Sequence, residues 1–217
     1  MDFSIARESM VKSQIQPNQV TDLDVLAAMA ELPREAFLPK ALQGVAYVDE
    51  DLPIGNGRHM MEPRVLARLM QAATVQATDV VLVIGCTTGY SAAVLSRLAS
   101  AVVAIEADAK LVQAATDTLN ELGVDTTLVL QGDLKAGCPK QAPFDVILFD
   151  GAVCEIPDAL ADQLADGGRL VAVVRENRAI GKAVQIVRKG DVVARRELFD
   201  ATVPWLPGFE PAAGFVF

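Results

Sequence analysis

Five consecutive aliphatic residues lead into a loop of glycine and small residues at Val80-Val81-Leu82-Val83-Ile84-Gly85-Cys86-Thr87-Thr88-Gly89-Tyr90. A continuous apolar run of this length, bounded by glycine, is typical of a strand that is buried on both faces of a parallel sheet. After the loop, apolar residues recur at helical spacing between residues 91 and 98. A strand, a glycine turn and a helix bring backbone N–H groups to a ligand in α/β folds, so this stretch predicts both a fold and a binding site.

The alternation of strand and helix continues along the chain. A second buried strand is expected at residues 101–105, and further strands at 126–130, 144–150 and 170–174. Helices are expected from Pro63, after the capping residue Asp108, and from Pro157 to the pair Gly167-Gly168. Two alternating runs that flank Lys189-Gly190-Asp191 indicate a hairpin. The pattern predicts a doubly wound, mostly parallel, Rossmann-like α/β sheet with an antiparallel hairpin at one edge.

The chain has a length that suits one domain with a substantial core. Residues 1–60 contain short helical patterns and then a loop rich in proline and glycine, and we expect them to form an N-terminal cap. Residues 61–217 would form the α/β core of the same domain. The last three residues, Phe215-Val216-Phe217, are expected to be extended and packed.

Composition narrows the class of protein. A formal net charge of −9 argues against a nucleic acid as partner, because phosphate neutralisation needs clustered Lys and Arg. The three cysteines follow no metal-ligand spacing and suit reduced thiols, and no metal site is expected. We find no signal peptide and no apolar run near the roughly 20 residues of a membrane span, so we expect a cytoplasmic protein without membrane contact. Nothing in the composition indicates an oligomeric state.

Acidic residues follow two of the predicted strands beyond the glycine loop. Glu106 comes about 20 positions after that loop, where a carboxylate can accept hydrogen bonds from two ribose hydroxyls. Asp133, one strand further on, could accept from an adenine amine. The loop has Thr87 where a pyrophosphate-binding fingerprint has its second glycine, so S-adenosylmethionine fits better than a dinucleotide. The plainer interpretation is a tight turn with two solvated caps.

Together with further motifs, these features resemble the protein-L-isoaspartate O-methyltransferase family along nearly the whole length of the chain. The N-terminal part of the resemblance consists of Met10-Val11, Gln14, Asp22, Val25-Leu26, Met29, Pro33-Arg34-Glu35, Phe37, Pro39, Ala46-Tyr47 and Leu52-Pro53-Ile54-Gly55. The core part consists of Ile84-Gly85, Gly89-Tyr90, Gly132-Asp133, Phe144-Asp145, Glu155-Ile156-Pro157, Gln163-Leu164 and Gly167-Gly168-Arg169-Leu170. The N-terminal segment and Glu155-Ile156-Pro157 are the more specific motifs.

The resemblance implies an S-adenosylmethionine-dependent repair enzyme that methylates isoaspartyl carboxylates of damaged proteins or peptides. By position it implies that the cofactor is bound by Gly85, Cys86, Thr87, Gly89, Glu106, Asp133 and Leu134. A substrate carboxylate is already ionised at pH 7, so positioning and desolvation would matter more than a strong base.

The sequence departs from the family pattern in the segment thought to hold the substrate. Met61 stands where the family has a serine, and a thioether cannot donate a hydrogen bond. Arg58 and His59 could replace that donor, and Asp150 ends a strand where many methyltransferases keep a catalytic polar residue. We therefore take Arg58, His59 and Asp150 as candidate catalytic residues. Each of them could equally be a loop, surface or capping residue.

Two core departures concern the cofactor. Val83 replaces a usual acidic residue, and Thr87 adds a Cβ atom where backbone approaches the ligand. Two alternatives therefore stay open beside the repair enzyme. The chain could methylate a different substrate, or it could be a non-catalytic binding protein that kept the fold.

Overall fold

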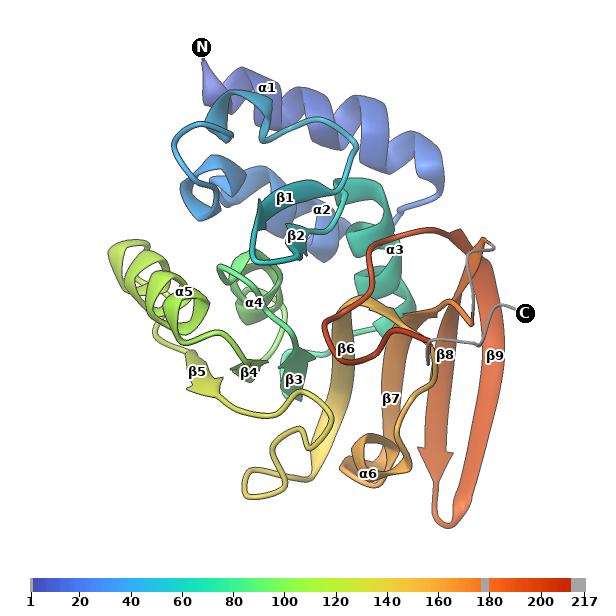
Figure 1. Ribbon diagram of the computed structural model, residues 1–217. Coiled ribbons are helices and arrows are strands. Elements are labelled where there is room, and N and C mark those ends of the chain that lie inside the picture. The colour runs from blue at the N-terminus through green and yellow to red at the C-terminus, as the bar shows by residue number, and fades with distance from the viewer. Residues whose placement is uncertain (1, 177–179, 212–217) are drawn as a thin grey trace, which may run out of the picture.

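A computed structural model describes residues 2–176 and 180–211 of the chain. Its centre is a seven-stranded sheet in the order β5-β4-β3-β6-β7-β8-β9 (Figure 1). The strands are β3 (Val80–Ile84), β4 (Ala101–Glu106), β5 (Thr127–Gln131), β6 (Phe144–Val153), β7 (Leu164–Val174), β8 (Gly181–Lys189) and β9 (Val192–Ala201). Neighbours from β5 to β7 pair in parallel, whereas β8 and β9 pair antiparallel. The predicted parallel sheet and edge hairpin are confirmed.

Helices precede and connect these strands. They are α1 (Phe3–Met10), α2 (Leu23–Glu31), α3 (Pro63–Ala73), α4 (Tyr90–Ser96), α5 (Ala109–Glu121) and α6 (Asp158–Ala161), with short turns η1 (Val11–Ile15), η2 (Gln16–Asn18), η3 (Arg34–Phe37) and η4 (Gln43–Val45). Asp108 caps α5 as predicted, because its side chain accepts from the N–H of Lys110. No helix within the described ranges is both long enough and apolar enough to cross a membrane.

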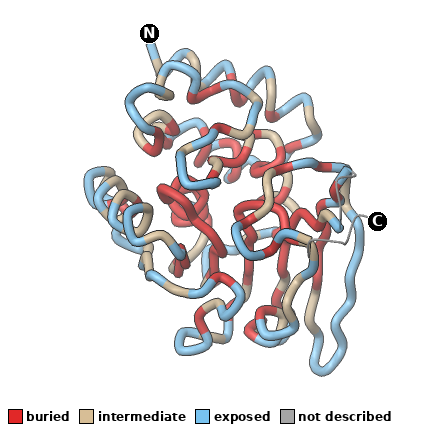
Figure 2. The backbone as a smooth tube through the Cα atoms, viewed as in Figure 1, coloured by how far each residue is buried: buried red, intermediate tan, exposed pale blue. Residues whose placement is uncertain are grey.

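Two apolar layers cover the sheet, and the alternation of side chains along each strand separates them. Val81 and Val146 face α3, α4 and α5 in a core that also includes residues of α1 and α2. Figure 2 shows the buried residues gathered in the centre of the molecule and the exposed ones along the outer helices and the edge hairpin. Leu82 and Ile147 face the other side, where they pack with Leu160 of α6 and with irregular segments. The second layer therefore contains much less helix than the first.

The structure differs from the prediction in several places. β6 runs three residues beyond Asp150, which was expected to end it, and β7 begins at Leu164 instead of residue 170. The loop between residues 46 and 60 contains a two-stranded antiparallel ribbon of β1 (Leu52–Gly55) and β2 (Arg58–Met60), whose strands are too short to give a periodic pattern. The helix expected from Pro157 to Gly167 ends at Ala161, because Leu164 pairs with Phe144 at the start of β7. The expected packing of Phe215-Val216-Phe217 lies outside the described residues.

Candidate active site

The site lies at the topological switch point of the sheet, where β3 neighbours both β4 and β6. The loop after β3 places Gly85, Thr87 and Gly89 at φ angles of 76°, 54° and 97°. Glycine adopts this left-handed region freely, but a β-branched residue is strained there. Thr87 thus occupies a position whose backbone suits glycine, which agrees with its departure from the family pattern.

Glu106 ends β4 and is almost fully buried beside that loop. One carboxylate oxygen, Oε2, accepts from the backbone N–H of Thr87 at 2.9 Å and from Nη2 of Arg58 at 2.9 Å. The other, Oε1, accepts from the N–H of Ala107 at 2.9 Å. Both oxygens of the carboxylate predicted to hold a ribose therefore already accept hydrogen bonds from groups of the chain itself.

Arg58 reaches this carboxylate from β2 and is 4% exposed. Its Nη2 also donates to the carbonyl oxygen of Gly85 at 2.8 Å, while its Nε has no hydrogen-bond partner in the structure. We predicted Arg58 as a group that could hold a substrate carboxylate. In the structure, the carboxylate it holds is that of Glu106.

Asp150 lies in β6, at an irregularity of the ladder between Leu148 and Ala152. Its Oδ2 accepts from the hydroxyl of Ser91 at 2.6 Å, and its Oδ1 has no partner in the structure. Burial raises the pKa of Asp150 to about 6, against the opposing effects of the Ser91 hydrogen bond and the nearby Arg58 and Arg34 charges.

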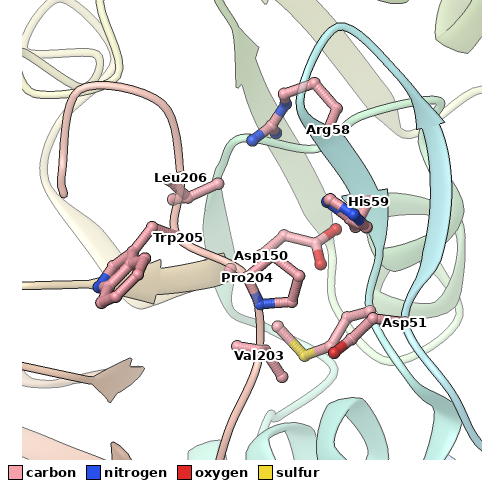
Figure 3. Close-up of a pocket in the computed structure, with 10 residues that line it drawn as sticks. Asp51, Arg58, His59, Asp150, Val203, Pro204, Trp205 and Leu206 are labelled. Atoms are coloured by element: carbon pink, nitrogen blue, oxygen red, sulfur yellow. The ribbon is translucent and has the colours of Figure 1, made fainter. Parts of the chain in front are cut away.

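A cavity of about 10 Å³ joins these residues. In Figure 3 the side chains of Arg58, His59, Asp150 and Leu206 converge on it, and Asp51 and Met61 complete its polar and apolar walls. A volume of this size holds about one water molecule. His59 extends from β2, and its Nδ1 is buried with no hydrogen-bond partner among the described residues.

Asp51 and Arg34 were not predicted as site residues, and only the tertiary structure brings them here. Asp51 accepts from the N–H of Glu62 at 2.9 Å, and burial raises its pKa to about 7 despite that bond. Arg34 is fully buried and donates from Nη2 to the carbonyl of Met61 at 2.8 Å. The Pro33-Arg34-Glu35 motif of the family resemblance included Arg34, but nothing in the sequence indicated that it would donate to the carbonyl of Met61.

The remaining predicted cofactor residues are spread more widely. Cys86 is fully buried, and burial raises the pKa of its thiol well above the usual value. Asp133 follows β5 and is exposed, with its Oδ1 accepting from the N–H of Lys135 at 2.9 Å. Leu134 is buried in the second apolar layer. Of the residues expected around adenine, Asp133 is exposed and Leu134 is buried, whereas Glu106 and the glycine loop are covered.

The methyl donor does not fit the site in this conformation. A Cβ atom added at Gly85 would lie 2.6 Å from Cδ2 of Leu206 and 2.8 Å from Nη2 of Arg58. One added at Gly151 would lie 2.8 Å from Leu206. Ligand pockets usually enclose about 300–1,000 Å³, far more than the space found here.

Fold and site together define a Rossmann-like α/β protein whose candidate site lies where the sheet order reverses. A family model described as "Protein-L-isoaspartate(D-aspartate) O-methyltransferase (PCMT)" matches residues 5–205. The chain belongs to this family, and the resemblance seen in the sequence is confirmed.

Individual relatives agree with this assignment. Protein-L-isoaspartate O-methyltransferase 1 of Rhodopseudomonas palustris (strain HaA2) is 39% identical over 96% of this chain and 85% of its own length. The enzyme of Methanoculleus marisnigri is 42% identical over 86% of this chain and 84% of its own length.

Solved structures show the same architecture. A protein-L-isoaspartate O-methyltransferase aligns with a TM-score of 0.83 at 26% identity, covering 94% of this chain and 67% of that one. A Plasmodium falciparum structure in complex with S-adenosyl-L-homocysteine aligns with a TM-score of 0.80 at 18% identity, covering 92% of this chain and 97% of that one. The latter comparison supports the fold alone.

Proposed function

We propose that this chain is an S-adenosylmethionine-dependent O-methyltransferase that acts on isoaspartyl carboxyl groups of proteins or peptides. The observation that carries the proposal is membership of the family over residues 5–205, with a glycine loop and a buried carboxylate at adjacent strand ends. The domain is proposed to be single, with residues 1–60 as a cap on residues 61–217.

His59 is the proposed donor to the substrate carboxylate. It lines the cavity from β2, and its Nδ1 lacks a hydrogen-bond partner in the structure, so this nitrogen can donate to an incoming oxygen when it carries the proton. Arg58 is less suited to that role, because its guanidinium is bound to Glu106. We propose a structural role for Asp150, whose carboxylate is held by the hydroxyl of Ser91. A proton-abstracting base is not needed, since the substrate carboxyl group is already ionised at neutral pH.

Methyl transfer to an isoaspartyl peptide, compared with the same peptide containing normal aspartate, tests the proposal. We expect radiolabelled methyl ester on the isoaspartyl peptide only. Measurable binding of S-adenosylhomocysteine with no turnover of either peptide would contradict the substrate assignment and favour a retargeted methyltransferase. Absence of both binding and turnover would favour a non-catalytic binding protein.

Met61 gives a specific reason to consider another substrate, because a buried thioether replaces the expected hydroxyl donor. We predict that Met61→Ser raises kcat/KM for the isoaspartyl peptide by about tenfold or more, since a hydrogen bond to a charged group contributes about 1.5–3 kcal/mol. The matched control is Met60→Ser, which changes an equally buried neighbour in β2. Equal effects of the two variants, or no gain, would show that residue 61 does not select the substrate.

A further inference from the structure

The candidate cofactor site contains two side chains of the chain itself, and they come from elements that are far apart in the sequence. Arg58 enters from β2 and forms a buried ion pair with Glu106 at 2.9 Å. Its Nη2 also binds the carbonyl of Gly85 at 2.8 Å. This guanidinium therefore donates both to the strand-end carboxylate and to a carbonyl of the glycine loop, the two features that a ribose and a methionine group would otherwise contact.

Leu206 fills the space on the other side of Gly85. It is 1% exposed, and it lies close above Gly85 and Gly151, where a Cβ atom at either position would clash with it. Backbone hydrogen bonds attach its segment to the end of β6. The N–H of Leu206 donates to the carbonyl of Ala152 at 2.8 Å, and the N–H of Ala152 donates to that of Pro204 at 2.8 Å.

The two side chains meet over the same glycine. The Cβ position at Gly85 lies 2.6 Å from Leu206 and 2.8 Å from Arg58, so the two groups cover one surface of the loop together. The residual cavity of about 10 Å³ is what remains between them and Asp150. A ligand on this surface of the loop would have to displace both side chains.

We infer that Arg58 and Leu206 form a latch that occupies the methyl-donor site, and that the donor binds only after β2 and residues 203–209 have separated from the glycine loop. The inference rests on the proposed function, because it assigns a regulated opening to the same site. When the binding-competent state of a protein is a minor one, its apparent affinity for the ligand is reduced in proportion to the population of that state. Minor states commonly have populations of about 0.1–10%, so the latch should weaken donor binding by about tenfold or more.

Trp205 reports on the latch directly. It is the chain's one tryptophan and precedes Leu206. Its indole Nε1 donates to the carbonyl of Arg175 at 3.1 Å, and the Arg175 guanidinium lies 4.2 Å from the ring centroid. Movement of residues 203–209 would change both contacts and hence the fluorescence of the indole.

The test is calorimetric titration with S-adenosylhomocysteine of the full chain and of Arg58→Gln, Leu206→Ala and the double variant. Glu106 keeps its backbone donors in Arg58→Gln. Matched controls are Arg97→Gln, which alters a surface ion pair with Glu31, and Leu160→Ala, which alters another buried leucine of the same apolar layer. We expect the double variant to bind at least about tenfold more tightly than the wild type, and the controls to bind like the wild type.

Equal affinity of the wild type and the double variant would overturn the latch, and turnover of the isoaspartyl peptide by that wild type would leave the proposed function standing. Binding by no variant, together with no turnover, would overturn both. If circular dichroism shows that the double variant is unfolded, the Trp205 fluorescence of the wild type provides the test instead. A saturable change on titration with S-adenosylhomocysteine supports the latch, and calorimetric binding without such a change overturns it.

Discussion

At the scale of single residues, the site holds two carboxyl groups with raised pKa values, that of the buried Asp150 and that of the partly buried Asp51. Burial is the main cause for both Asp51 and Asp150, with pKa values of about 7 and about 6. Each group also keeps one hydrogen-bond donor, the N–H of Glu62 for Asp51 and the hydroxyl of Ser91 for Asp150. Between the unfolded and the folded pKa values, these two acids are therefore protonated in the folded chain and ionised in the unfolded chain.

We predict that the free energy of unfolding falls as pH rises from about 4 to about 7 because of these groups, and that their contribution is constant at higher pH. An unfolded aspartate titrates near about 3.9, so between that value and the raised pKa the folded chain binds more protons than the unfolded chain. Each pKa unit of difference corresponds to at most about 1.4 kcal/mol. Urea denaturation at pH 5, 6, 7 and 8 measures the slope.

The variant Asp51→Asn should flatten this slope, most clearly between pH 6 and 7, because the amide oxygen still accepts from Glu62 but does not titrate. Asp125→Asn, at an exposed position, serves as the control and should leave the slope unchanged. Parallel curves for wild type and Asp51→Asn would show that Asp51 has an ordinary pKa in the folded chain.

At the scale of elements, the side chain of Arg34 in the N-terminal cap connects the cap to the segment between β2 and α3. Its Nε donates to the carbonyl of Ala46 at 2.8 Å and its Nη2 to that of Met61 at 2.8 Å. Its guanidinium also lies 4.8 Å from the ring centroid of Tyr90 in α4. One side chain thereby fixes η3, the loop before β1 and the junction of β2 with α3 relative to one another.

We predict that Arg34→Ala destabilises the fold and loosens the β2–α3 junction. Two buried carbonyl groups would lose their donor, at about 1–3 kcal/mol each. Chemical denaturation gives the loss, and hydrogen exchange of the amides at residues 58–63 gives its location. Arg97→Ala breaks a partly exposed pair with Glu31 and should cost no more than about 1 kcal/mol. A similar cost for both variants would refute the structural role of Arg34.

At the scale of the whole molecule, the cap and the α/β core share one apolar cluster. Met29 of the cap and Val81 of the sheet belong to it, and Phe37 contacts Tyr90 of α4 with ring centroids 5.5 Å apart. A shared core of this kind makes separate unfolding of residues 1–60 costly. It supports the proposed single domain.

We predict one cooperative unfolding transition. Trp205 fluorescence, which reports on the core, and far-UV circular dichroism, which also reports on the cap helices, should give the same midpoint in urea. Phe37→Ala should lower both midpoints together, with a loss of about 3–5 kcal/mol, because it removes a buried ring from the shared cluster. An early change in the dichroism alone would mean that the cap is an independent unit.

Much of the fold follows from local patterns in the sequence. The aliphatic runs predicted β3 and β4 to within one residue at either end, because a strand buried on both faces must be apolar throughout. The partly exposed edge strand β5 was also predicted to within one residue. The β1–β2 ribbon was missed because its strands are stabilised by contacts of Arg58 and Asn56 with distant residues rather than by their own periodicity. The length of α6 was overestimated because an apolar Leu164 suits a helix and a strand equally well. Its pairing with Phe144 of β6 makes it part of a strand.

The sequence by itself determined the class of fold, the family and the position of the candidate site, since glycine loops and strand-end acids are encoded by consecutive residues. Only the tertiary structure decided what occupies that site. Arg58 and Leu206 are 148 positions apart in the sequence. The residues next to each of them do not predict that both contact Gly85. The glycine loop therefore remains the centre of the molecule, but its partners come from chain topology and side-chain packing, which act across the whole length of the chain.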